Sequence, residues 1–371
     1  MPHACSTTAP PRRPARPREE PARLDLCPAI DADAPAWERY AAEHADGTVH
    51  HRWGWAQAVQ RAFGHTGRHL IARRGSRVAG ILPLTQVNSR IAGRMLISVP
   101  YGIYGGPLAD DDAVAAALLA RARALADELS ARVLELRCLR PCDESLPIAT
   151  RHVTFRRTLP ARVDEVADWL PRKARAAARR AGEKHTLEVA FDRAAVGTAW
   201  RLYAATMRRL GSINYPRAFF EALSDELRDD CRVQIVYCRH GAQRRAVAGL
   251  LTLRHGETAL PYLVGYDERA DIYGLTNFLY CESMRDAVAC GCRVYDFGRS
   301  RVDNAGSVAF KESFGFEATP LAYQAYVPGG AAPPDLDAGS RRWAAARAAW
   351  RWLPLPVTRW LGGVLAGSIP G

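Results

Sequence analysis

Residues 294–316 read VYDFGRSRVDNAGSVAFKESFGF, and this stretch organises the interpretation of the whole chain. Its apolar start, Val294 to Phe297, has the pattern of a buried strand, and Gly298 permits a sharp turn directly after it. The polar residues around this turn are Asp296, Arg299, Ser300 and Arg301. So many polar groups beside core aromatic residues predict a functional site.

The elements around this stretch alternate between helices and strands. In the second half, apolar periodicity predicts helices at 196–210, 217–227 and 276–290 and strands at 233–238, 246–254, 258–264 and 294–297. In the first half it predicts helices at 53–63 and 113–130 and strands at 69–72, 78–87, 95–99, 132–138 and 153–159, with a further helix at 163–181. This order predicts a mixed α/β (α+β) chain made of two tandem copies of one fold, each a mostly antiparallel sheet flanked by helices.

Length and composition fit two domains. The chain has 371 residues, 48% of them hydrophobic, and a formal net charge of +12, which would attract anionic partners such as a CoA thioester, a nucleotide sugar, tRNA or an acidic membrane. We expect a disordered tail at 1–23, domains at 24–160 and 161–328, and a linker with an amphipathic tail at 329–371. The tail at 1–23 lacks the apolar run of a secretory signal.

The nine cysteines lack zinc-ligand spacing and are expected to be reduced thiols of a cytoplasmic protein. The sequence also lacks a phosphate-binding P-loop and a dinucleotide fingerprint. A metal site, a nucleotide hydrolase and a dehydrogenase are therefore not expected.

Three motifs carry a resemblance to a known family. They are Tyr104-Gly105-Gly106-Pro107, Asp296-Phe297-Gly298-Arg299-Ser300 and Phe310-Lys311-Glu312-Ser313-Phe314-Gly315-Phe316. In this order and separation they resemble FemAB-related proteins of exosortase/PEP-CTERM systems, within the superfamily of GNAT-fold transferases that includes the Fem aminoacyltransferases. The resemblance covers roughly residues 50–326. It implies two tandem GNAT-like domains and transfer of an acyl or aminoacyl group to an amine.

The resemblance makes Lys311 a catalytic candidate, because Fem-type transferases carry a functional lysine in a similar Phe-Lys setting. Its ammonium could stabilise a tetrahedral oxyanion or hold a phosphate. Asp296 could accept a proton from the attacking amine or instead clamp Arg299, and the alternative is that it pairs with another nearby arginine or caps a turn. Arg299, Ser300 and Arg301 are candidates for binding the substrate, the two arginines through a phosphate or carboxylate.

Further candidates lie outside this turn. Tyr101 and Tyr104 belong to a glycine-rich loop that a substrate could approach closely, and Asn277 and Tyr280 match positions of the family pattern. The alternative for all four is packing or capping. His50, His51 and His65 are interpreted as satisfied structural histidines.

Two features point to larger partners. Arg172, Arg175 and Arg179 fall near one face of a predicted helix and could bind a polyanion such as tRNA, or form a solvated face. After Pro356, an interfacial helix with Trp360, Leu361 and Leu365 on its apolar side could touch a membrane, although it could equally pack on the protein.

The expected reaction is N-acylation of an amino sugar or similar amine, free or lipid-linked, in exopolysaccharide or cell-envelope synthesis. Acyl-CoA is the expected co-substrate, without a tightly bound cofactor. The Gly-rich turn that usually holds the CoA pyrophosphate is replaced by a poor match at 269–274, so aminoacyl-tRNA stays open as the donor. A non-catalytic scaffold is the third hypothesis, and DNA is not an expected partner.

Overall fold

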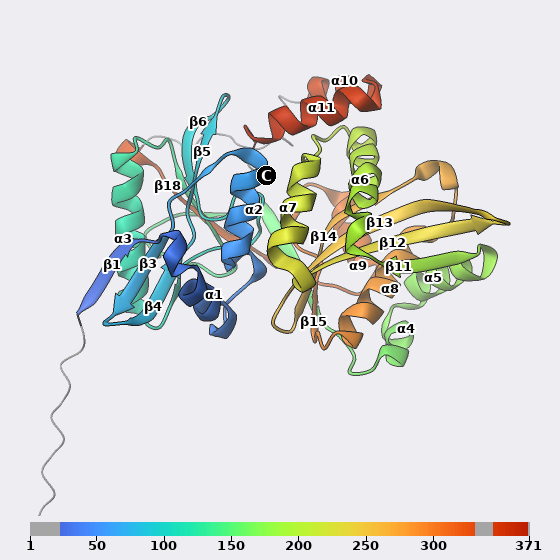
Figure 1. Cartoon of the computed structure of the whole chain (residues 1–371), viewed down its shortest axis with the longest axis horizontal. Helices are drawn as coiled ribbons and strands as arrows, with labels where there is room; N and C mark the ends of the chain where they lie inside the picture. Colours follow the sequence, from blue (N-terminus) through green and yellow to red (C-terminus); the bar gives the residue numbers. More distant parts are fainter. Residues whose placement is uncertain (1–22, 331–343, 370–371) are drawn as a thin grey trace, which may run out of the picture.

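The computed structural model describes residues 23–330 and 344–369, and its strands form three β-sheets within these ranges. Two lobes lie side by side along the long axis, the first mostly in blue to teal and the second mostly in green to orange (Figure 1). The mixed α/β order predicted from the sequence is confirmed. The expected disordered tail lies outside the described residues, apart from Arg23.

Two sheets build the first lobe. One has the order β1 (Leu24–Pro28), β3 (Leu70–Arg74), β4 (Arg77–Leu82), β7 (Leu108–Ala109). The other has the order β2 (Thr66–Gly67), β5 (Thr85–Ser89), β6 (Gly93–Ile97), β8 (Leu134–Cys138), β18 (Ala322–Tyr326), β9 (Ile148–Ala149). Helices α1 (Ala34–Glu43) and α3 (Asp112–Glu128) pack on these sheets, whereas α2 (Trp53–Phe63) packs mainly against α7 (Arg217–Leu227) of the second lobe. Asp111 caps α3 by accepting from the Val114 amide, and Leu118, Ala122 and Ala126 form its buried face.

The second lobe is built on an eight-stranded sheet. Its order is β11 (Leu187–Phe191), β12 (Cys231–His240), β13 (Gln243–His255), β14 (Thr258–Tyr266), β15 (Val294–Asp296), β10 (His152–Thr158), β16 (Ser300–Arg301), with β17 (Ala318–Pro320) also paired to β10. The helices are α4 (Val166–Trp169), α5 (Arg172–Lys184), α6 (Val196–Leu210), α7 (Arg217–Leu227), α8 (Leu275–Ala289) and α9 (Ala305–Glu312).

The two lobes exchange strands. β10 leaves the first half of the chain and pairs with β15 in the second lobe, where Arg156 lies opposite Asp296. In return, β18 from the end of the second half pairs with β8 in the first lobe. A division at 160/161 remains a proposal for the domain boundary, and each lobe contains a strand from the other side of it.

Two expected elements are interrupted at prolines. The predicted strand 78–87 is two strands, β4 and β5, which separate at Pro83-Leu84 and enter different sheets. The predicted helix 163–181 is split into α4 and α5 because Leu170 is extended before Pro171. Both single-element predictions were wrong, the helix because the residue before proline is extended and the strand because proline has no N–H to donate to the ladder.

Strands β14 and β15 run parallel and pair over only two residues, at Thr258/Val294 and Ala259/Tyr295. β14 then continues to Tyr266, while β15 ends at Asp296. The sheet therefore opens between these two strands, and the turn of residues 296–301 follows at the opening.

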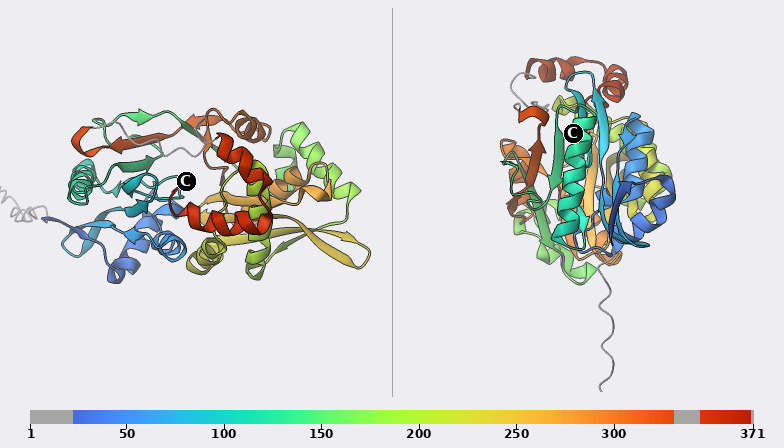
Figure 2. Two further views of the ribbon diagram at one scale, coloured as in Figure 1. Left: turned by 90° about the horizontal axis from the view of Figure 1, so that it is seen from above. Right: turned by 90° about the vertical axis from the view of Figure 1, so that its left-hand side faces the viewer.

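Helices α10 (Ala344–Trp352) and α11 (Leu355–Ala366) lie across one side of the molecule, against α6 (Figures 1 and 2). The break between them falls at Leu353-Pro354, as the prolines there predict. None of the helices in the described residues is long and apolar enough to cross a membrane.

Candidate active site

The turn after β15 lies where the two lobes meet. Asp296 is 1% exposed, and its Oδ1 accepts hydrogen bonds from the Gly298 amide at 2.7 Å, the Tyr104 hydroxyl at 3.0 Å and the Thr154 hydroxyl at 3.4 Å. Its Oδ2 lies 3.3 Å from Arg156 Nε. Because Tyr104 comes from the first lobe and Asp296 from the second, this carboxylate joins the two.

Burial raises the pKa of Asp296 above its ordinary value, against the opposing effects of Arg156 and of the hydrogen bonds. A carboxylate with a raised pKa is a better proton acceptor than an exposed one. The environment of Asp296 is therefore suited to general-base chemistry. The arginine that it pairs with is Arg156 and not Arg299, and it also caps the turn by accepting from the Gly298 amide.

Lys311 lies on α9, 8% exposed, with its Nζ 2.9 Å from the Gly298 carbonyl oxygen and 3.0 Å from that of Arg299. It donates to both carbonyls and also lies over the Phe155 ring, 4.9 Å from the centroid. Desolvation lowers the pKa of Lys311 to about 7, although the Asp296 charge opposes this. The lysine thus holds the backbone of the turn, and its charge is adjustable near neutral pH.

Arg299 points its guanidinium toward the first lobe. Nη1 donates to the Tyr323 hydroxyl at 3.3 Å, and that hydroxyl donates to the Ile103 carbonyl at 2.7 Å. Within residues 23–330 and 344–369, we find no carboxylate in ion-pair contact with Arg299. A guanidinium with several donors and no acidic partner is a candidate for binding a substrate anion.

A cavity of about 40 Å³ adjoins Asp296, enough for one or two water molecules. Polar residues from both lobes line it, among them Thr48, His50, Tyr104, Arg156 and His255. His50 is 1% exposed, and neither of its ring nitrogens has a hydrogen-bond partner among the residues that the structure describes. Burial lowers the pKa of His50 well below its ordinary value, so this ring is neutral.

The expectation of satisfied histidines holds for two of the three. His51 contacts the Thr48 hydroxyl and the Gly106 carbonyl, and His65 contacts the Tyr101 hydroxyl. It is wrong for His50. The position of His50 next to His51 does not reveal this difference, because the side chains of the two adjacent residues point into different environments.

Thr154, Arg156 and Tyr323 are further site residues that the sequence analysis missed. Thr154 and Arg156 lie two apart on β10 and so face the same side of the sheet. The strand exchange brings β10 beside Asp296, and only long-range pairing could have revealed that.

Tyr101 lies in the first lobe, and its side chain contacts other groups of the protein. Its hydroxyl donates to the Ala366 carbonyl at 3.0 Å, and its ring stacks on Phe63 with centroids 3.9 Å apart. Its φ of 65° is in the left-handed region, which is uncommon for a non-glycine residue. Of the two tyrosines predicted to bind substrate, Tyr104 is the one that contacts Asp296.

The remaining candidates support the turn. The Ser300 hydroxyl lies 2.8 Å from that of Ser307, and Arg301 pairs with Asp303. Tyr280 is buried with its ring 5.0 Å from that of Phe297. Asn277 is half-buried on the same helix, α8.

The basic helix α5 lies apart from the turn and packs against α8. Arg172 is exposed, Arg175 pairs with Asp168 at 2.5 Å, and Arg179 lies 3.6 Å from Glu183. Two of the three arginines predicted to bind a polyanion therefore already have acidic neighbours.

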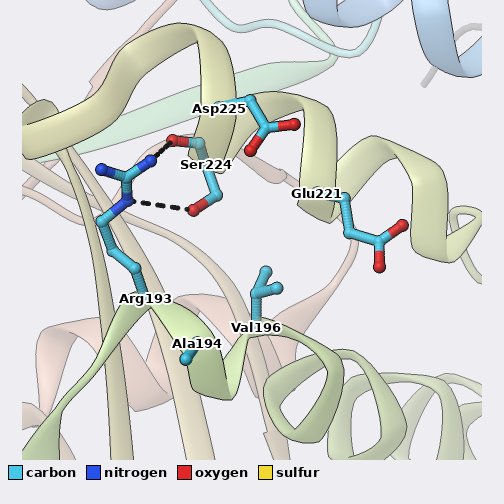
Figure 3. Close-up of a pocket in the computed structure, with 6 residues that line it drawn as sticks. All are labelled: Arg193, Ala194, Val196, Glu221, Ser224 and Asp225. Atoms are coloured by element: carbon cyan, nitrogen blue, oxygen red, sulfur yellow. Dashed lines mark hydrogen bonds between the residues drawn. The ribbon is translucent and has the colours of Figure 1, made fainter.

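A second hollow, of about 280 Å³, lies between α7 and the short helix η4 (Arg193–Ala195) that precedes α6 (Figure 3). Arg193 reaches across it and donates to the Ser224 carbonyl at 2.7 Å. Since its cation is already held by the protein, the cavity beside Asp296 is the better candidate site.

Comparisons with known proteins show which domain and which folds the chain is similar to. Residues 170–312, which contain Asp296, Arg299 and Lys311, match the family model of the acetyltransferase (GNAT) domain. Among the curated proteins, no match was found.

Solved structures share the fold over most of the chain. The crystal structure of FemX has a TM-score of 0.62 at 15% identity, covering 82% of this chain and 97% of that one. A tandem GNAT protein from the clavulanic acid biosynthesis pathway has a TM-score of 0.51 at 15% identity, covering 84% and 100%. The C-terminal domain of a protein assigned as a lysylphosphatidylglycerol synthetase from Agrobacterium fabrum has 0.51 at 14%, covering 79% and 92%.

The chain is thus an acyltransferase built from two tandem GNAT-like domains. Enzymes with the GNAT domain that residues 170–312 match take acyl-CoA as co-substrate without a tightly bound cofactor, and the fold of most of the chain is similar to that of FemX.

Proposed function

We propose that this enzyme transfers an acyl group to the amine of an amino sugar or similar acceptor, with Asp296 as general base. The observation that carries the proposal is the buried carboxylate with a raised pKa, held at the junction of the lobes beside a polar cavity. An acceptor amine near this cavity would be held by groups of both lobes.

The reaction balances with the groups present. The amine nitrogen forms a bond to the acyl carbon, the bond from that carbon to the donor sulfur or oxygen breaks, and Asp296 takes one amine proton and returns it to the leaving group. The raised pKa of Asp296 assists the first transfer, and burial among Tyr104 and Thr154 fixes its orientation.

Arg299 is assigned to an anionic group of donor or acceptor, because it has five N–H donors and a phenol as its partner. Lys311 holds the Gly298 and Arg299 carbonyls and is primarily a positioning residue for this turn. Its positive charge also favours a developing oxyanion nearby.

Acyl-CoA is the donor we propose. The segment 269–274 connects β14 to α8, and α5 packs against it so closely that a Cβ on Gly274 would lie 2.2 Å from the Ala177 carbonyl oxygen. One arginine of α5, Arg180, lies over the Tyr273 ring, 5.3 Å from its centroid, just before the start of α8, where a helix N-terminus favours phosphate. This arrangement supports binding of the donor phosphates despite the missing Gly-rich turn.

Aminoacyl-tRNA is the alternative donor, favoured by the basic character of α5 and by the fold shared with FemX. A tRNA would contact many exposed arginines, whereas CoA needs few. Removing the charges of Arg172, Arg175 and Arg179 together should abolish tRNA binding and weaken CoA binding only modestly.

The biological setting proposed is exopolysaccharide or envelope synthesis, in the cytoplasm or at the inner face of the membrane. It rests on the motifs at 104–107, 296–300 and 310–316, which resemble those of FemAB-related proteins of exosortase/PEP-CTERM systems. A sugar acceptor, free or lipid-linked, follows from the same resemblance.

The test is an acyl-transfer assay with a panel of acyl-CoAs and amino sugars, following thiol release. Asp296→Asn and Arg299→Ala should each lower kcat/KM by about 100-fold or more. The matched controls are Asp164→Asn and Arg293→Ala, since both residues form exposed ion pairs. Full activity in Asp296→Asn would exclude the general-base role, and salt-sensitive binding of charged tRNA alone would favour the alternative donor.

A further inference from the structure

Helix α11 has two faces of different character. On its inner face, Thr358, Gly362 and Ala366 are buried, and a Cβ on Gly362 would lie 2.3 Å from Asn214 Oδ1. The end of the helix also reaches the first lobe, where the Ser89 hydroxyl donates to the Ser368 carbonyl at 2.7 Å. Because these contacts fix the inner face, the opposite face is held outward.

The outer face is apolar and exposed. Val357, Trp360 and Val364 are 38%, 69% and 51% exposed, and their spacing of three and four residues places them on one side of the helix. Trp352, at the end of α10, is 87% exposed. The sequence analysis expected Leu361 and Leu365 on this side with Trp360, but both leucines are half-buried.

The charge around this face is of one sign. From Ala338 to Gly371 the sequence contains five arginines and no acidic residue or lysine. Three of these arginines, at 347, 351 and 359, lie on α10 and α11. Arg359 lies over the Trp200 ring of α6, and the exposed Arg351 donates to the Leu210 carbonyl oxygen, so this positive charge lies along the side of the helix pair that adjoins α6.

We propose that the outer face of α10 and α11 docks on an anionic lipid surface. Tryptophan rings are suited to the headgroup region of a bilayer, and arginines beside them are attracted to anionic lipid. A helix of 12 residues lies in the interface plane with one apolar face inserted. An acidic partner would complement the arginines, and the flat apolar strip fits a lipid surface rather than a pocket.

The experiment is co-sedimentation of the full chain with vesicles of phosphatidylcholine containing about one quarter phosphatidylglycerol, compared with pure phosphatidylcholine, without donor or acceptor. We expect binding to the anionic vesicles that falls at least about tenfold in the double variant Trp352→Ser/Trp360→Ser and weakens in high salt. Tyr273→Ser is the control, since Tyr273 is 68% exposed elsewhere on the chain.

Three outcomes would overturn the proposal. The wild type could stay in the supernatant with anionic vesicles, or bind both vesicle types equally. It could also sediment as a dimer without lipid and become a monomer in the double variant, which would make this face an interface between copies. Since no acyl transfer is measured, any of these leaves the proposed reaction untouched.

Discussion

Asp296 and Arg156 show how one position acquires chemistry from its surroundings. A strand-end aspartate in water would be an ordinary acid, yet here burial dominates the Arg156 ion pair and the net pKa is raised. The rate of a reaction that uses this carboxylate as a base should therefore depend on pH through the raised pKa of Asp296.

We expect the rate of acyl transfer to fall as pH falls through the raised pKa of Asp296, because only the carboxylate accepts a proton. Asp296→Asn should lower kcat by about 100- to 10,000-fold and remove this acidic limb. Rate measurements from pH 4.5 to 8 test this. An unchanged limb in the variant would assign it to another group.

The lowered pKa of Lys311 leads to a prediction about how stability depends on pH. Its pKa is about 7 in the folded chain against an ordinary value of 10.5, so between these values the unfolded chain binds the extra proton. Stability must then rise with pH in this window, relative to Lys311→Met. Comparing Tm of the two proteins from pH 6.5 to 9.5 checks it, and parallel curves would contradict the shift.

Replacing His50 should affect the stability and the activity of the protein differently. His50→Leu removes two buried nitrogens that lack partners, so we expect Tm to stay level or rise while activity falls. His51→Leu is the matched control, because it removes hydrogen bonds and should cost about 1–3 kcal/mol. Equal destabilisation by both changes would show that His50 is bonded in solution, for example to water.

At the scale of elements, the contact between α5 and α8 depends on one glycine. Gly274 has φ 79° and lies against the Ala177 carbonyl, whereas Gly256 has φ 52° and open space around it. Both positions favour glycine, but only Gly274 also needs the room.

Gly274→Ala should therefore be much more destabilising than Gly256→Ala. We expect about 1 kcal/mol for Gly256→Ala from backbone strain alone, and at least about 3 kcal/mol for Gly274→Ala. Urea unfolding of both variants measures the difference. Similar costs would mean that α5 shifts easily away from α8.

The sequence predicted the elements well where their periodicity is local. Helices α2, α3, α6, α7 and α8 lie within one or two residues of expectation. The short strand β11 and the helices α1 and α9 were missed, and the two elements interrupted at proline were joined. Short segments carry too few periodic residues to be distinguished from loops.

At the scale of the molecule, the strand exchange ties the two lobes together. β18 completes the sheet of the first lobe beside β8, and β10 lies inside the sheet of the second between β15 and β16. A core cluster that includes Trp55, Phe219 and Tyr323 spans the junction. The lobes should consequently unfold together.

A fragment of residues 24–160 should fail to fold on its own, because β8 lacks β18 and β10 lacks its neighbours. We expect no cooperative melt by circular dichroism, and recovery of structure when residues 161–371 are supplied in trans. The intact chain is the control. A cooperative transition in the isolated fragment would show that the exchange is dispensable.

By itself, the sequence determined the class of fold, the long helices and the polar turn at 296–301, since these follow from local periodicity and residue type. The tertiary structure alone decided that Asp296 meets Tyr104, Thr154 and Arg156, and that His50 lies unpartnered beside them. The Tyr104 hydroxyl and the Asp296 carboxylate are 192 positions apart in the chain, and Thr154 and Arg156 reach the same carboxylate from the exchanged strand β10. Pairing between distant strands depends on the assembled sheet and leaves no periodic signal in either segment.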